Sequence, residues 1–387
     1  MNVLLAGGGT GGHVYPGLAV AEAVRRHDPA ARVLFVGSRM GMEASLVPAA
    51  GVPFVGLPVH PPRSRVPLRL AVSAASVGLG LVQAFGVVAR FRPDAVIATG
   101  GVVAVPPVIA GAAFNVPVVV LEGNAVPGRT NLLLARYGRI IAVASDEAAA
   151  RLPAARTVVT GLPIRREVYT ATREDGLASF RLDRSRKTVL IVGGSQGAVR
   201  LNAAVADAVQ RLASRRDLQV VHQIGRGWSG GGGDHPPAAV AGGLSPLAEG
   251  LSPAVEGMRY LPVPYIEQIG PAYACADLVV SRCGANALAE ITANGLPAIL
   301  VPYPFAADDH QTHNASALVA GGAAVLISDA QLTGERLASA MAELLDTPGR
   351  LEAMAASARK QGRPDAADRV AALISRLAQP LAEEVRG

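Results

Sequence analysis

The chain has 387 residues, of which 50% are hydrophobic and 4% aromatic, and its formal net charge is +6. This length is more than one ordinary α/β domain needs and suits two, and the apolar content excludes a largely disordered chain. The basic residues are spread without a long block, which argues against nucleic-acid binding but suits an anionic substrate, a nucleotide diphosphate or an anionic membrane face.

Short apolar runs alternate with helical stretches through both halves of the chain. Such alternation predicts parallel sheets covered by helices, and hence two Rossmann-like domains at residues 1–165 and 166–365 with a hinge within 162–173. The tail at 366–387 belongs to a stretch, 351–385, that is predicted to be helical. The predicted strands are residues 3–6, 33–36, 95–98, 118–121, 140–143, 188–192, 219–222, 278–280 and 298–301.

Residues 70–89 form an apolar, uncharged stretch that contains Ser73 and Gln83 and is flanked by arginines, among them Arg69 and Arg90. One interpretation is a buried helix of the first domain. The other is an apolar helix face that rests on an anionic bilayer.

Residues 225–257 are rich in Gly, Pro, Ser and Ala. This composition cannot bury enough apolar surface to order itself, so it predicts a surface loop or flexible insertion.

The sequence also bears on the compartment. Cys275 and Cys283 are too few for a disulfide framework and lack metal-ligand spacing. Met1 and Asn2 lead directly into the first predicted strand, without a basic and apolar leader. We therefore expect a cytoplasmic protein.

A glycine-rich turn, GGGTGGH at residues 7–13, lies between the first predicted strand and a helix. Glycines at such a turn let backbone N–H groups approach an anion or a sugar closely. The spacing does not fit the dinucleotide-binding fingerprint, and Gly-Ser-Arg at residues 37–39 offers no acidic group to a ribose. A nicotinamide-dependent dehydrogenase is therefore disfavoured.

His13 ends this turn at the carboxyl edge of the predicted sheet, where open α/β folds bind ligands. It is either a hydrogen-bonded loop residue or a general base that takes a proton from an attacking hydroxyl. Two further strand ends carry Gly100 and Gly101, and Glu122 and Asn124. Turn chemistry explains the glycines, whereas carboxylates and amides such as Glu122 and Asn124 bind sugar hydroxyls.

In the second half, GGSQGA at residues 193–198 and SRCGAN at 281–286 each join a strand to a helix. Two helix N-termini suit a diphosphate without a metal ion, and the chain has no Asp-x-Asp motif. Glu290 is either a solvated helix residue or a carboxylate that holds both ribose hydroxyls. Gln311 is suited to sugar hydroxyls.

Taken together, these segments resemble the MurG family, the bacterial peptidoglycan transferases that add N-acetylglucosamine to lipid I to give lipid II. The resemblance runs from Leu4 to about Arg369, outside the Gly/Pro-rich segment. Its most specific motifs lie at residues 9–17, 192–198, 300–304, 309–311 and 314–315.

The resemblance implies the two-domain GT-B glycosyltransferase fold, with the domains facing a cleft and the C-terminal tail able to cross back to the first domain. It implies UDP-N-acetylglucosamine as donor, undecaprenyl-linked lipid I as acceptor, and no cofactor or metal ion. The reaction would be an inverting single displacement that forms a β-1,4 bond to the muramoyl C4 hydroxyl. The enzyme would work on the cytoplasmic face of an anionic membrane and bind no nucleic acid.

The resemblance also assigns roles to residues. His13 would be the base, and Gly100, Gly101 and Glu122 would lie on the acceptor side, in the membrane-side N-terminal domain. Uracil would lie beside Ile266. The residues implied for the donor, most of them in the C-terminal domain, are Thr10, Gly11, Gly12, Asn124, Arg165, Ser195, Ile266, Ala285, Asn286, Ala287, Leu288, Ala289, Glu290 and Gln311.

Several positions depart from the family pattern. Leu121 and Gly123 replace a His and a Gln, residues 102–105 replace Tyr-x-Ser-x, residues 162–164 replace Asn-Pro-Val, and Ala287 replaces a usual threonine. Three alternatives therefore stay open: a GT-B transferase with another acceptor, a UDP-sugar epimerase, and a noncatalytic nucleotide-sugar-binding subunit.

Overall fold

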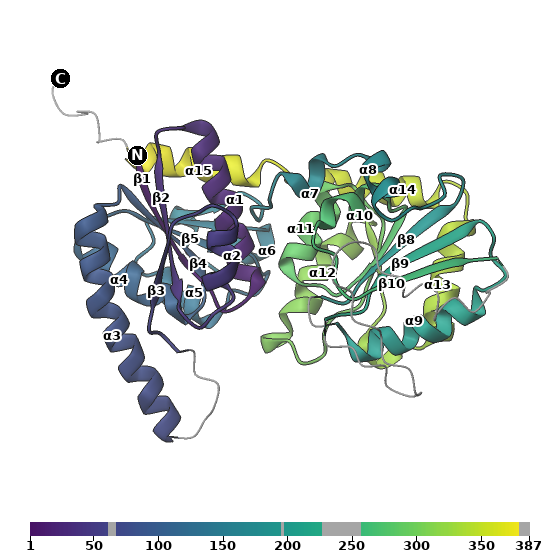
Figure 1. Ribbon diagram of the computed structural model, residues 1–387, viewed down its shortest axis with the longest axis horizontal. Helices are drawn as coiled ribbons and strands as arrows, with labels where there is room; N and C mark the ends of the chain where they lie inside the picture. Colours follow the sequence, from purple (N-terminus) through teal and green to yellow (C-terminus); the bar gives the residue numbers. More distant parts are fainter. Residues whose placement is uncertain (61–66, 195–196, 227–256, 379–387) are drawn as a thin grey trace. The chain divides into compact units, whose positions relative to one another are not determined.

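The computed structural model describes residues 1–60, 67–194, 197–226 and 257–378, apart from the side chains of 67–71. The chain divides into two compact units, which we call unit 1 (Met1–Arg165 with Arg363–Gly387) and unit 2 (Arg166–Gly362). Each contains one parallel sheet with helices on both faces (Figure 1). The predicted pair of Rossmann-like α/β domains is thus confirmed.

The described part of unit 1 holds a seven-stranded sheet in the order β3-β2-β1-β4-β5-β6-β7. All its neighbouring strands pair in parallel, as the alternating strand and helix pattern requires. The strands are β1 (Asn2–Gly7), β2 (Arg32–Ser38), β3 (Phe54–Leu57), β4 (Ala95–Gly100), β5 (Val118–Glu122), β6 (Ile140–Val143) and β7 (Thr157–Val159).

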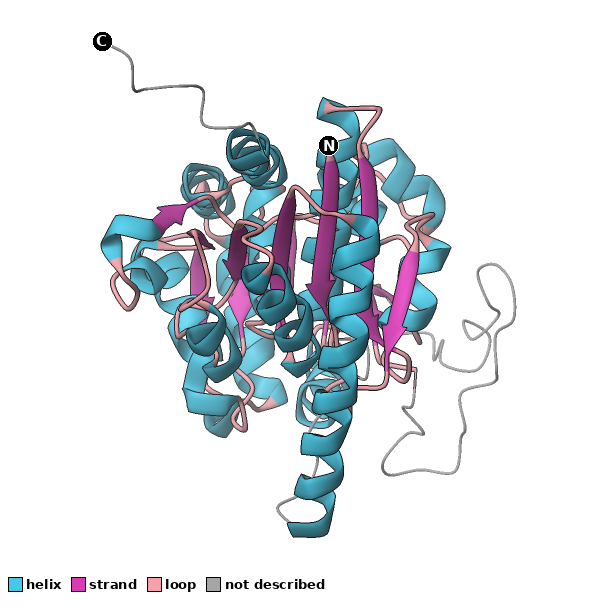
Figure 2. Ribbon diagram, turned by 90° about the vertical axis from the view of Figure 1, so that its left-hand side faces the viewer, coloured by secondary structure: helices cyan, strands magenta, loops and turns pink. Residues whose placement is uncertain are grey.

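The helices of unit 1 cover both faces of this sheet, because successive strand residues point to opposite sides (Figure 2). Val3 and Leu5 of β1 face one apolar cluster, with α1, α2 and α15, whereas Leu4 and Ala6 face another, with α3, α4, α5 and α6. These helices are α1 (Gly11–His27), α2 (Glu43–Ala49), α3 (Pro67–Phe91), α4 (Val105–Ala113), α5 (Arg129–Leu134), α6 (Asp146–Ala149) and α15 (Ala366–Ala378).

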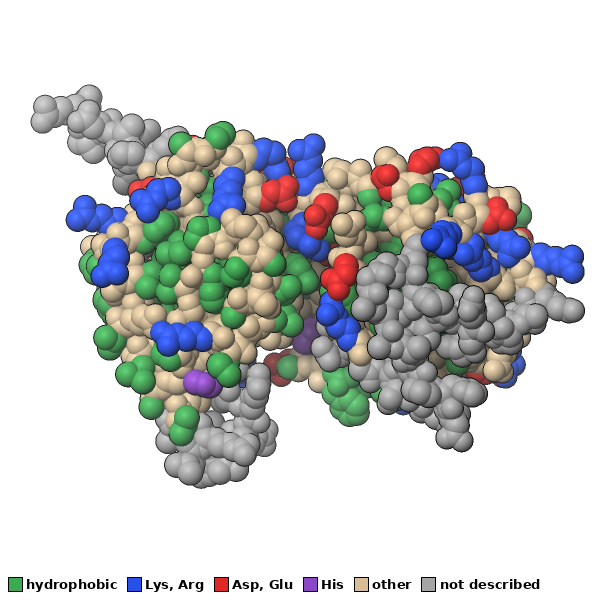
Figure 3. All heavy atoms as spheres, viewed as in Figure 1, with side chains coloured by type: hydrophobic (Ala, Val, Ile, Leu, Met, Phe, Trp, Pro, Cys, Tyr) green, Lys and Arg blue, Asp and Glu red, His purple; other side chains and the backbone are tan. Residues whose placement is uncertain are grey.

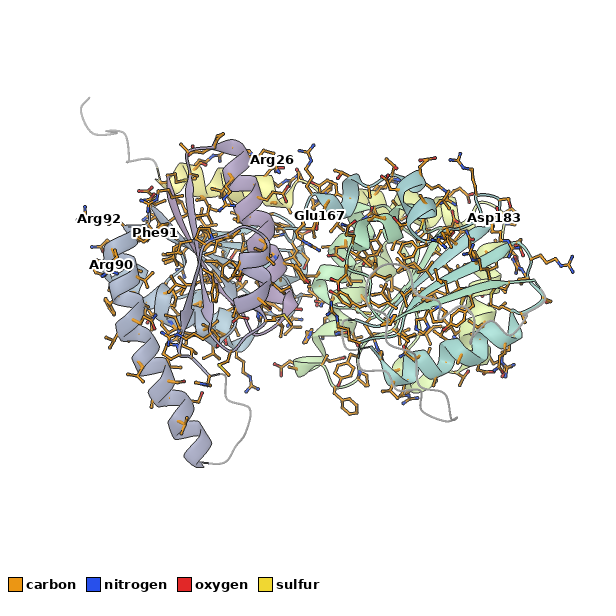
Figure 4. The ribbon with its side chains drawn as sticks, in the orientation of Figure 1. Arg26, Arg90, Phe91, Arg92, Glu167 and Asp183 are labelled. Carbon is orange, nitrogen blue, oxygen red and sulfur yellow. The ribbon has the colours of Figure 1, made fainter. Side chains whose placement is uncertain are left out.

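The C-terminal helix α15 is part of unit 1, although the whole of unit 2 precedes it in the sequence. Its residues Val370 and Ile374 are buried in the same cluster as α1. Asp368 accepts from Arg26, which Figure 4 labels, and lies 2.7 Å from Nε2 of His27. Arg26 and His27 are both at the end of α1. Apolar burial and these ion pairs together hold the tail on α1.

Helix α3 is only partly buried, and it runs past the end of the sheet in both ribbon views. Ala84 and Val88 face the core, and the rings of Phe85 and Phe114 lie 5.9 Å apart. Val82 on the same helix is 74% exposed. The stretch Val72–Phe91 is long and apolar enough to span a membrane by length and composition alone, and 28% of it is buried. Buried residues recur every three or four positions from Ser73 to Val88, so the interpretation of α3 as a buried core helix fits one face of it only.

Unit 2 repeats the architecture, with a six-stranded sheet among its described residues in the order β10-β9-β8-β11-β12-β13. Again all neighbouring strands are parallel. The strands are β8 (Lys187–Val192), β9 (Leu218–Gln223), β10 (Arg259–Val263), β11 (Leu278–Ser281), β12 (Ala298–Leu300) and β13 (Ala324–Leu326).

Helices cover both faces of this second sheet as well. Val189 and Ile191 of β8 face the cluster formed with α9 and α13, and Leu190 faces the one with α10 and α11. The helices are α7 (Glu167–Thr170), α8 (Arg173–Ser179), α9 (Val199–Arg211), α10 (Ile269–Cys275), α11 (Ala285–Ala293), α12 (His310–Ala320), α13 (Gly334–Asp346) and α14 (Arg350–Gln361). The Gly/Pro-rich segment predicted as a loop lies, at residues 227–256, outside the described residues.

Candidate active site

In unit 1 the two glycine turns meet where the strand order reverses. β1 lies between β2 and β4, so the turns after β1 and β4 are neighbours at the carboxyl edge of the sheet. The N–H of Gly8 donates to the carbonyl oxygen of Gly100 at 3.3 Å, which ties the turns together. Such reversal points are where open α/β sheets bind ligands.

His13 lies in the first turn of α1, beside both glycine turns. Its Nδ1 is 2.9 Å from the carbonyl oxygen of Gly8 and 3.4 Å from the hydroxyl of Thr10. A carbonyl accepts only, so Nδ1 carries the proton in the neutral ring and Nε2 keeps its lone pair. A Cβ on Gly100 would lie 2.8 Å from Nε2, so only glycine leaves space for the ring. His13 is thus arranged to accept a proton at Nε2.

Glu43, the first residue of α2, is a site residue that sequence reasoning missed. Its side chain is fully buried, Oε1 accepts from the N–H of Ser38 at 2.9 Å, and Oε2 accepts from the N–H of Gly9 at 3.0 Å. The carboxylate therefore joins the end of β2 to the glycine turn after β1. The signal was a glutamate five residues after a strand end, further along than a ribose-binding acid would stand.

Glu122 ends β5 and Asn124 follows it, and the carboxylate of Glu122 accepts hydrogen bonds from the loop after β5 and from α5. Oε1 accepts from the backbone N–H of Asn124 at 2.8 Å and from its side-chain amide at 3.2 Å. Oε2 accepts from the N–H of Gly128 and the amide of Asn131, at 2.9 and 3.0 Å. Glu122 is 3% exposed, so it positions Asn124 rather than offering a bare carboxylate to a ligand.

The remaining predicted residues of unit 1 are at the same turn. Arg165 lies with its guanidinium carbon 4.6 Å from the ring centre of Tyr15, a cation–π contact that directs the charge toward α1. The same ring is the nearest neighbour of a Cβ built on Gly11, at 3.1 Å. Thr10, Gly11 and Gly12 open the helix, and Gly12 is exposed.

Unit 2 has the same reversal point, between β8 and β11. Helix α9 begins after the turn that follows β8, and α11 begins after Gly284, which follows β11. Two helix N-termini therefore lie at this edge of the sheet, each with backbone N–H groups for an anion. Ser195 lies outside the described residues. Within the described ranges, no three His, Cys, Asp or Glu side chains are grouped as metal ligands.

Gln223, the last residue of β9, is a second residue that sequence reasoning missed. Its amide nitrogen donates to the carbonyl of Gly194 at 3.0 Å, and its oxygen accepts from the N–H of Ile266 at 2.9 Å. The side chain is 3% exposed. Gln223 thus links the predicted diphosphate turn to the predicted uracil residue. In the sequence it was only the residue after the strand predicted at 219–222.

Glu290 lies one and a half turns into α11 and is half-buried. Its Oε2 accepts from the hydroxyl of Tyr273 on α10 at 3.1 Å. Burial, followed by the negative charge of Glu290, raises the pKa of Tyr273 well above its usual value, so this hydroxyl stays a donor. The contact fixes the orientation of the Glu290 carboxylate.

Gln311, near the start of α12, links the segments that follow β11 and β12. Its Oε1 accepts from the backbone N–H of Cys283 at 3.1 Å and of Tyr303 at 2.9 Å. These two donors leave the side-chain NH2 as the group for a sugar hydroxyl. Gln311 is thereby placed beside the start of α11.

The predicted stretch along α11 is not uniform. The side chains of Ala285, Asn286, Ala287 and Ala289 are half-buried, but Leu288 is 5% exposed and packs in the core of unit 2. Leu288 therefore can meet a ligand only through its backbone, because its side chain belongs to the apolar cluster. Ile266, at 7% exposed, is also mostly core.

Comparison with known protein families also divides the chain into an N-terminal and a C-terminal domain. Residues 3–143 match the glycosyltransferase family 28 N-terminal domain, and residues 188–370 match the glycosyltransferase family 28 C-terminal domain. Together these two matches cover most of the chain.

Among curated relatives, a UDP-N-acetylglucosamine–N-acetylmuramyl-(pentapeptide) pyrophosphoryl-undecaprenol N-acetylglucosamine transferase from Desulforudis audaxviator is 40% identical over 98% of this chain and 99% of its own length. The crystal structure of Acinetobacter baumannii MurG covers 97% of this chain and 99% of its own, with a TM-score of 0.74 and 28% identity.

A UDP-N-acetylglucosamine 2-epimerase from Neisseria meningitidis covers 97% of this chain and 100% of its own, with a TM-score of 0.65. It is 13% identical, so this likeness concerns the fold alone. The two family-28 domains and the full-length relatives decide the family, and the chain belongs to the MurG family of glycosyltransferases.

Proposed function

We infer that this protein transfers N-acetylglucosamine from UDP-N-acetylglucosamine to lipid I and so forms lipid II for peptidoglycan synthesis. The observation that carries this is the 40% identity, over almost the whole of both chains, to a relative whose name states that transfer. The match spans both units, including the His13 turn and α11.

His13 is the base of this reaction. Nε2 takes the proton of the muramoyl C4 hydroxyl as the hydroxyl oxygen attacks C1 of the donor sugar, and the bond to UDP breaks on the opposite side. Attack from that side inverts the anomeric carbon and turns an α-linked donor into a β-linked product. The Nδ1 contact with Gly8 supports this role because it presents Nε2 as the acceptor.

Unit 2 holds the donor. The N-termini of α9 and α11 stabilise the negative charge that develops on the leaving diphosphate, as a metal ion does in other transferases. Glu290 accepts from the ribose hydroxyls and Gln311 donates to the sugar. Arg165 and Ser195 complete the diphosphate contacts, Ile266 borders uracil, and Asn124, held by Glu122, reaches the sugar.

The protein works as a peripheral protein on the inner face of the cell membrane, and α3 is the segment that meets the lipid. Three observations support this: Val72, Leu79 and Val82 are 57%, 64% and 74% exposed, apolar side chains follow α3 in Figure 3, and Arg90 and Arg92 stand at its end in Figure 4. An apolar face with basic neighbours suits an anionic bilayer surface.

The vesicle test of this surface uses apolar substitutions with a matched control. Leu79→Ser with Val82→Ser should weaken binding to anionic vesicles, and neutralising Arg90 or Arg92 should cost about 1 kcal/mol per charge. Val199→Ser, a similarly exposed valine (70%) on α9 of unit 2, should leave binding unchanged. Unchanged binding in the α3 variants would remove α3 from the proposal.

The function itself is tested with UDP-N-acetylglucosamine and lipid I, scoring lipid II, free UDP and epimerised sugar in one reaction. We expect lipid II and UDP in equal amounts, at a rate that excess EDTA does not change. His13→Ala should abolish most of this rate, whereas His27→Ala, at the other end of α1, should not. Epimerised sugar without lipid II would instead identify an epimerase, and no turnover a binding subunit.

A further inference from the structure

The buried carboxylate of Glu43 occupies a space that glycines leave for it. A Cβ on Gly8 would lie 2.0 Å from its Oε1, and a Cβ on Gly41 2.3 Å from the same atom. Burying a carboxylate is costly unless both oxygens find donors. Here the donors are the backbone N–H groups of Ser38 and Gly9. The buried carboxylate of Glu43 is therefore in direct contact with the glycine turn.

One peptide group separates this carboxylate from His13. The N–H of Gly9 donates to Oε2 of Glu43 at 3.0 Å, and the carbonyl oxygen of Gly8 accepts from Nδ1 of His13 at 2.9 Å. The carbonyl of Gly8 and the N–H of Gly9 belong to the same planar peptide unit. Glu43 and His13 thus bind the two ends of one rigid dipole.

Such an arrangement couples the two side chains electrostatically. An acceptor at the N–H end of a peptide polarises it and makes its carbonyl oxygen a stronger acceptor, since hydrogen bonds in a chain reinforce one another. A stronger Gly8 acceptor holds the proton of His13 on Nδ1. It also stabilises the imidazolium that forms when Nε2 takes a proton, as a directly bonded carboxylate does in a serine-protease triad.

We propose that Glu43 is a positioning residue for the catalytic base, acting on His13 through the Gly8–Gly9 peptide. The proposal rests on the proposed function, in which His13 is that base. It assigns Glu43 a role in proton transfer in addition to holding the turn.

The other polar and charged groups at this turn are engaged elsewhere or bind His13 less closely. Arg39, near the end of β2, donates to the carbonyl of Gly56 at 2.7 Å. Arg165 lies over Tyr15, whose ring is on α1 beside the turn. The Thr10 hydroxyl is 3.4 Å from Nδ1, a longer contact than that of Gly8. The carbonyl of Gly8 is thus the better partner of the His13 proton.

Glu122 supplies the matched control within the same unit. It too is a buried carboxylate that organises a strand-end loop through backbone N–H groups, but its partners lie in the loop after β5 and on α5. Glu43→Gln and Glu122→Gln each replace one such oxygen with an NH2. Only the first faces the peptide that binds His13.

The direct test is nitrogen NMR of the histidine rings, with His13 assigned by its loss in His13→Gln. In the native protein, neutral His13 should carry its proton on Nδ1. Glu43→Gln should give a mixture of the two tautomers, whereas Glu122→Gln should leave the native tautomer. A native ring protonated on Nε2, or a Glu43→Gln ring unchanged from native, would overturn the proposal. The native measurement decides even if Glu43→Gln does not fold.

Kinetics give a second readout that a merely structural role would not move. Glu43→Gln should lower kcat about 10- to 100-fold, the range known for hydrogen-bond partners of metal-bound histidines. It should leave donor KM nearly unchanged, because the loss is confined to proton transfer. Glu43→Asp keeps the charge and should recover part of the rate. A native kcat in Glu43→Gln, or a raised donor KM in place of a lowered kcat, would contradict the proposal.

These outcomes distinguish a failure of the base assignment of His13 from a failure of the role proposed for Glu43. If His13→Ala keeps its kcat while Glu43→Gln changes the tautomer, the coupling stands and the base assignment falls. If His13→Ala loses activity while Glu43→Gln keeps both the native tautomer and the native kcat, only the role of Glu43 falls.

Discussion

The glycine turns after β1 and β8 have the same architecture and different chemistry. Each joins a buried strand to a helix at the point where its sheet reverses order. The turn of unit 1 is backed by the carboxylate of Glu43 and followed by His13. The turn of unit 2 is held by the neutral amide of Gln223. The two turns occupy equivalent positions in their sheets. The side chains that contact each turn decide which of the two takes part in proton transfer.

The two turns differ in function, and we call this difference the division of labour between the units. In unit 1 an ionisable ring and a buried carboxylate share one peptide, an arrangement suited to moving a proton. In unit 2, Gln223, Gln311 and the Tyr273–Glu290 pair are donors and acceptors with fixed orientations, an arrangement suited to recognition. Substitutions of His13 and Glu43 should therefore change kcat, and substitutions of these unit 2 residues should change donor KM.

The largest effect is expected at His13. A base acts only as the hydroxyl loses its proton, so His13→Ala should lower kcat by roughly 10² to 10⁴ with donor KM nearly unchanged. Steady-state kinetics at saturating lipid I measure both. A raised donor KM with an intact kcat would make His13 a positioning residue of its turn.

Glu290 should show the opposite pattern. It holds the ribose before and during the reaction, so Glu290→Gln should raise donor KM by up to about 100-fold, equivalent to about 3 kcal/mol, with a smaller change in kcat. Tyr273→Phe removes only the hydroxyl that orients the carboxylate. It should raise donor KM less. A loss of kcat without a change in KM would end the ribose assignment.

Gln223 and Gln219 allow a sharper test, because both are buried glutamines of β9. Gln219 bonds to Asp183 and Thr188, away from the turn. Replacing either by Leu leaves buried backbone or hydroxyl groups without partners and should lower the free energy of unfolding by about 2 kcal/mol. Only Gln223→Leu should also raise donor KM, by several-fold. Equal KM values in the two variants would show that the Gly194–Ile266 link is purely structural.

An effect on stability alone, with none expected on catalysis, concerns His222 in the core of unit 2. Burial lowers the pKa of His222 to about 3, and its ring contacts Tyr260 and Asn202 at 2.8 and 3.1 Å. The unfolded histidine binds a proton below about pH 6.5, whereas the folded one does not until near pH 3. As the pH falls through this window, the free energy of unfolding should therefore fall by up to about 1.4 kcal/mol per pH unit.

His222→Gln removes this proton uptake together with the two ring contacts. The variant should be less stable than the native protein at pH 7, and urea denaturation should show the two curves converging as the pH falls toward 4. Parallel curves would mean that His222 is protonated in the folded state.

The central strands of both sheets could be predicted from the sequence, and the edge strands could not. Central strands are buried on both faces and read as continuous apolar runs, as in residues 118–121. The four strands missed, β3, β7, β10 and β13, are the edges of the two sheets. Edge strands are covered less, so β7 needs no apolar run and β10 tolerates Pro262.

For the site, the sequence predicted the residues at strand ends but not those that hold them. His13 and Gln311 stand in recognisable motifs, whereas Glu43 and Gln223 act through backbone groups of turns far away in the sequence. Glu122 was predicted as a sugar ligand, and its four contacts with the following loop and with α5 are visible only in three dimensions. A carboxylate satisfied by backbone N–H groups looks the same in a sequence as one that faces a substrate.

The division of labour is tested most directly by calorimetry of UDP-N-acetylglucosamine binding to His13→Ala and Glu290→Gln in the absence of acceptor. The account predicts that His13→Ala binds the donor within about twofold of the native protein although its turnover is lost, and that Glu290→Gln binds it much more weakly. A His13→Ala variant that loses donor affinity as severely as Glu290→Gln would contradict it.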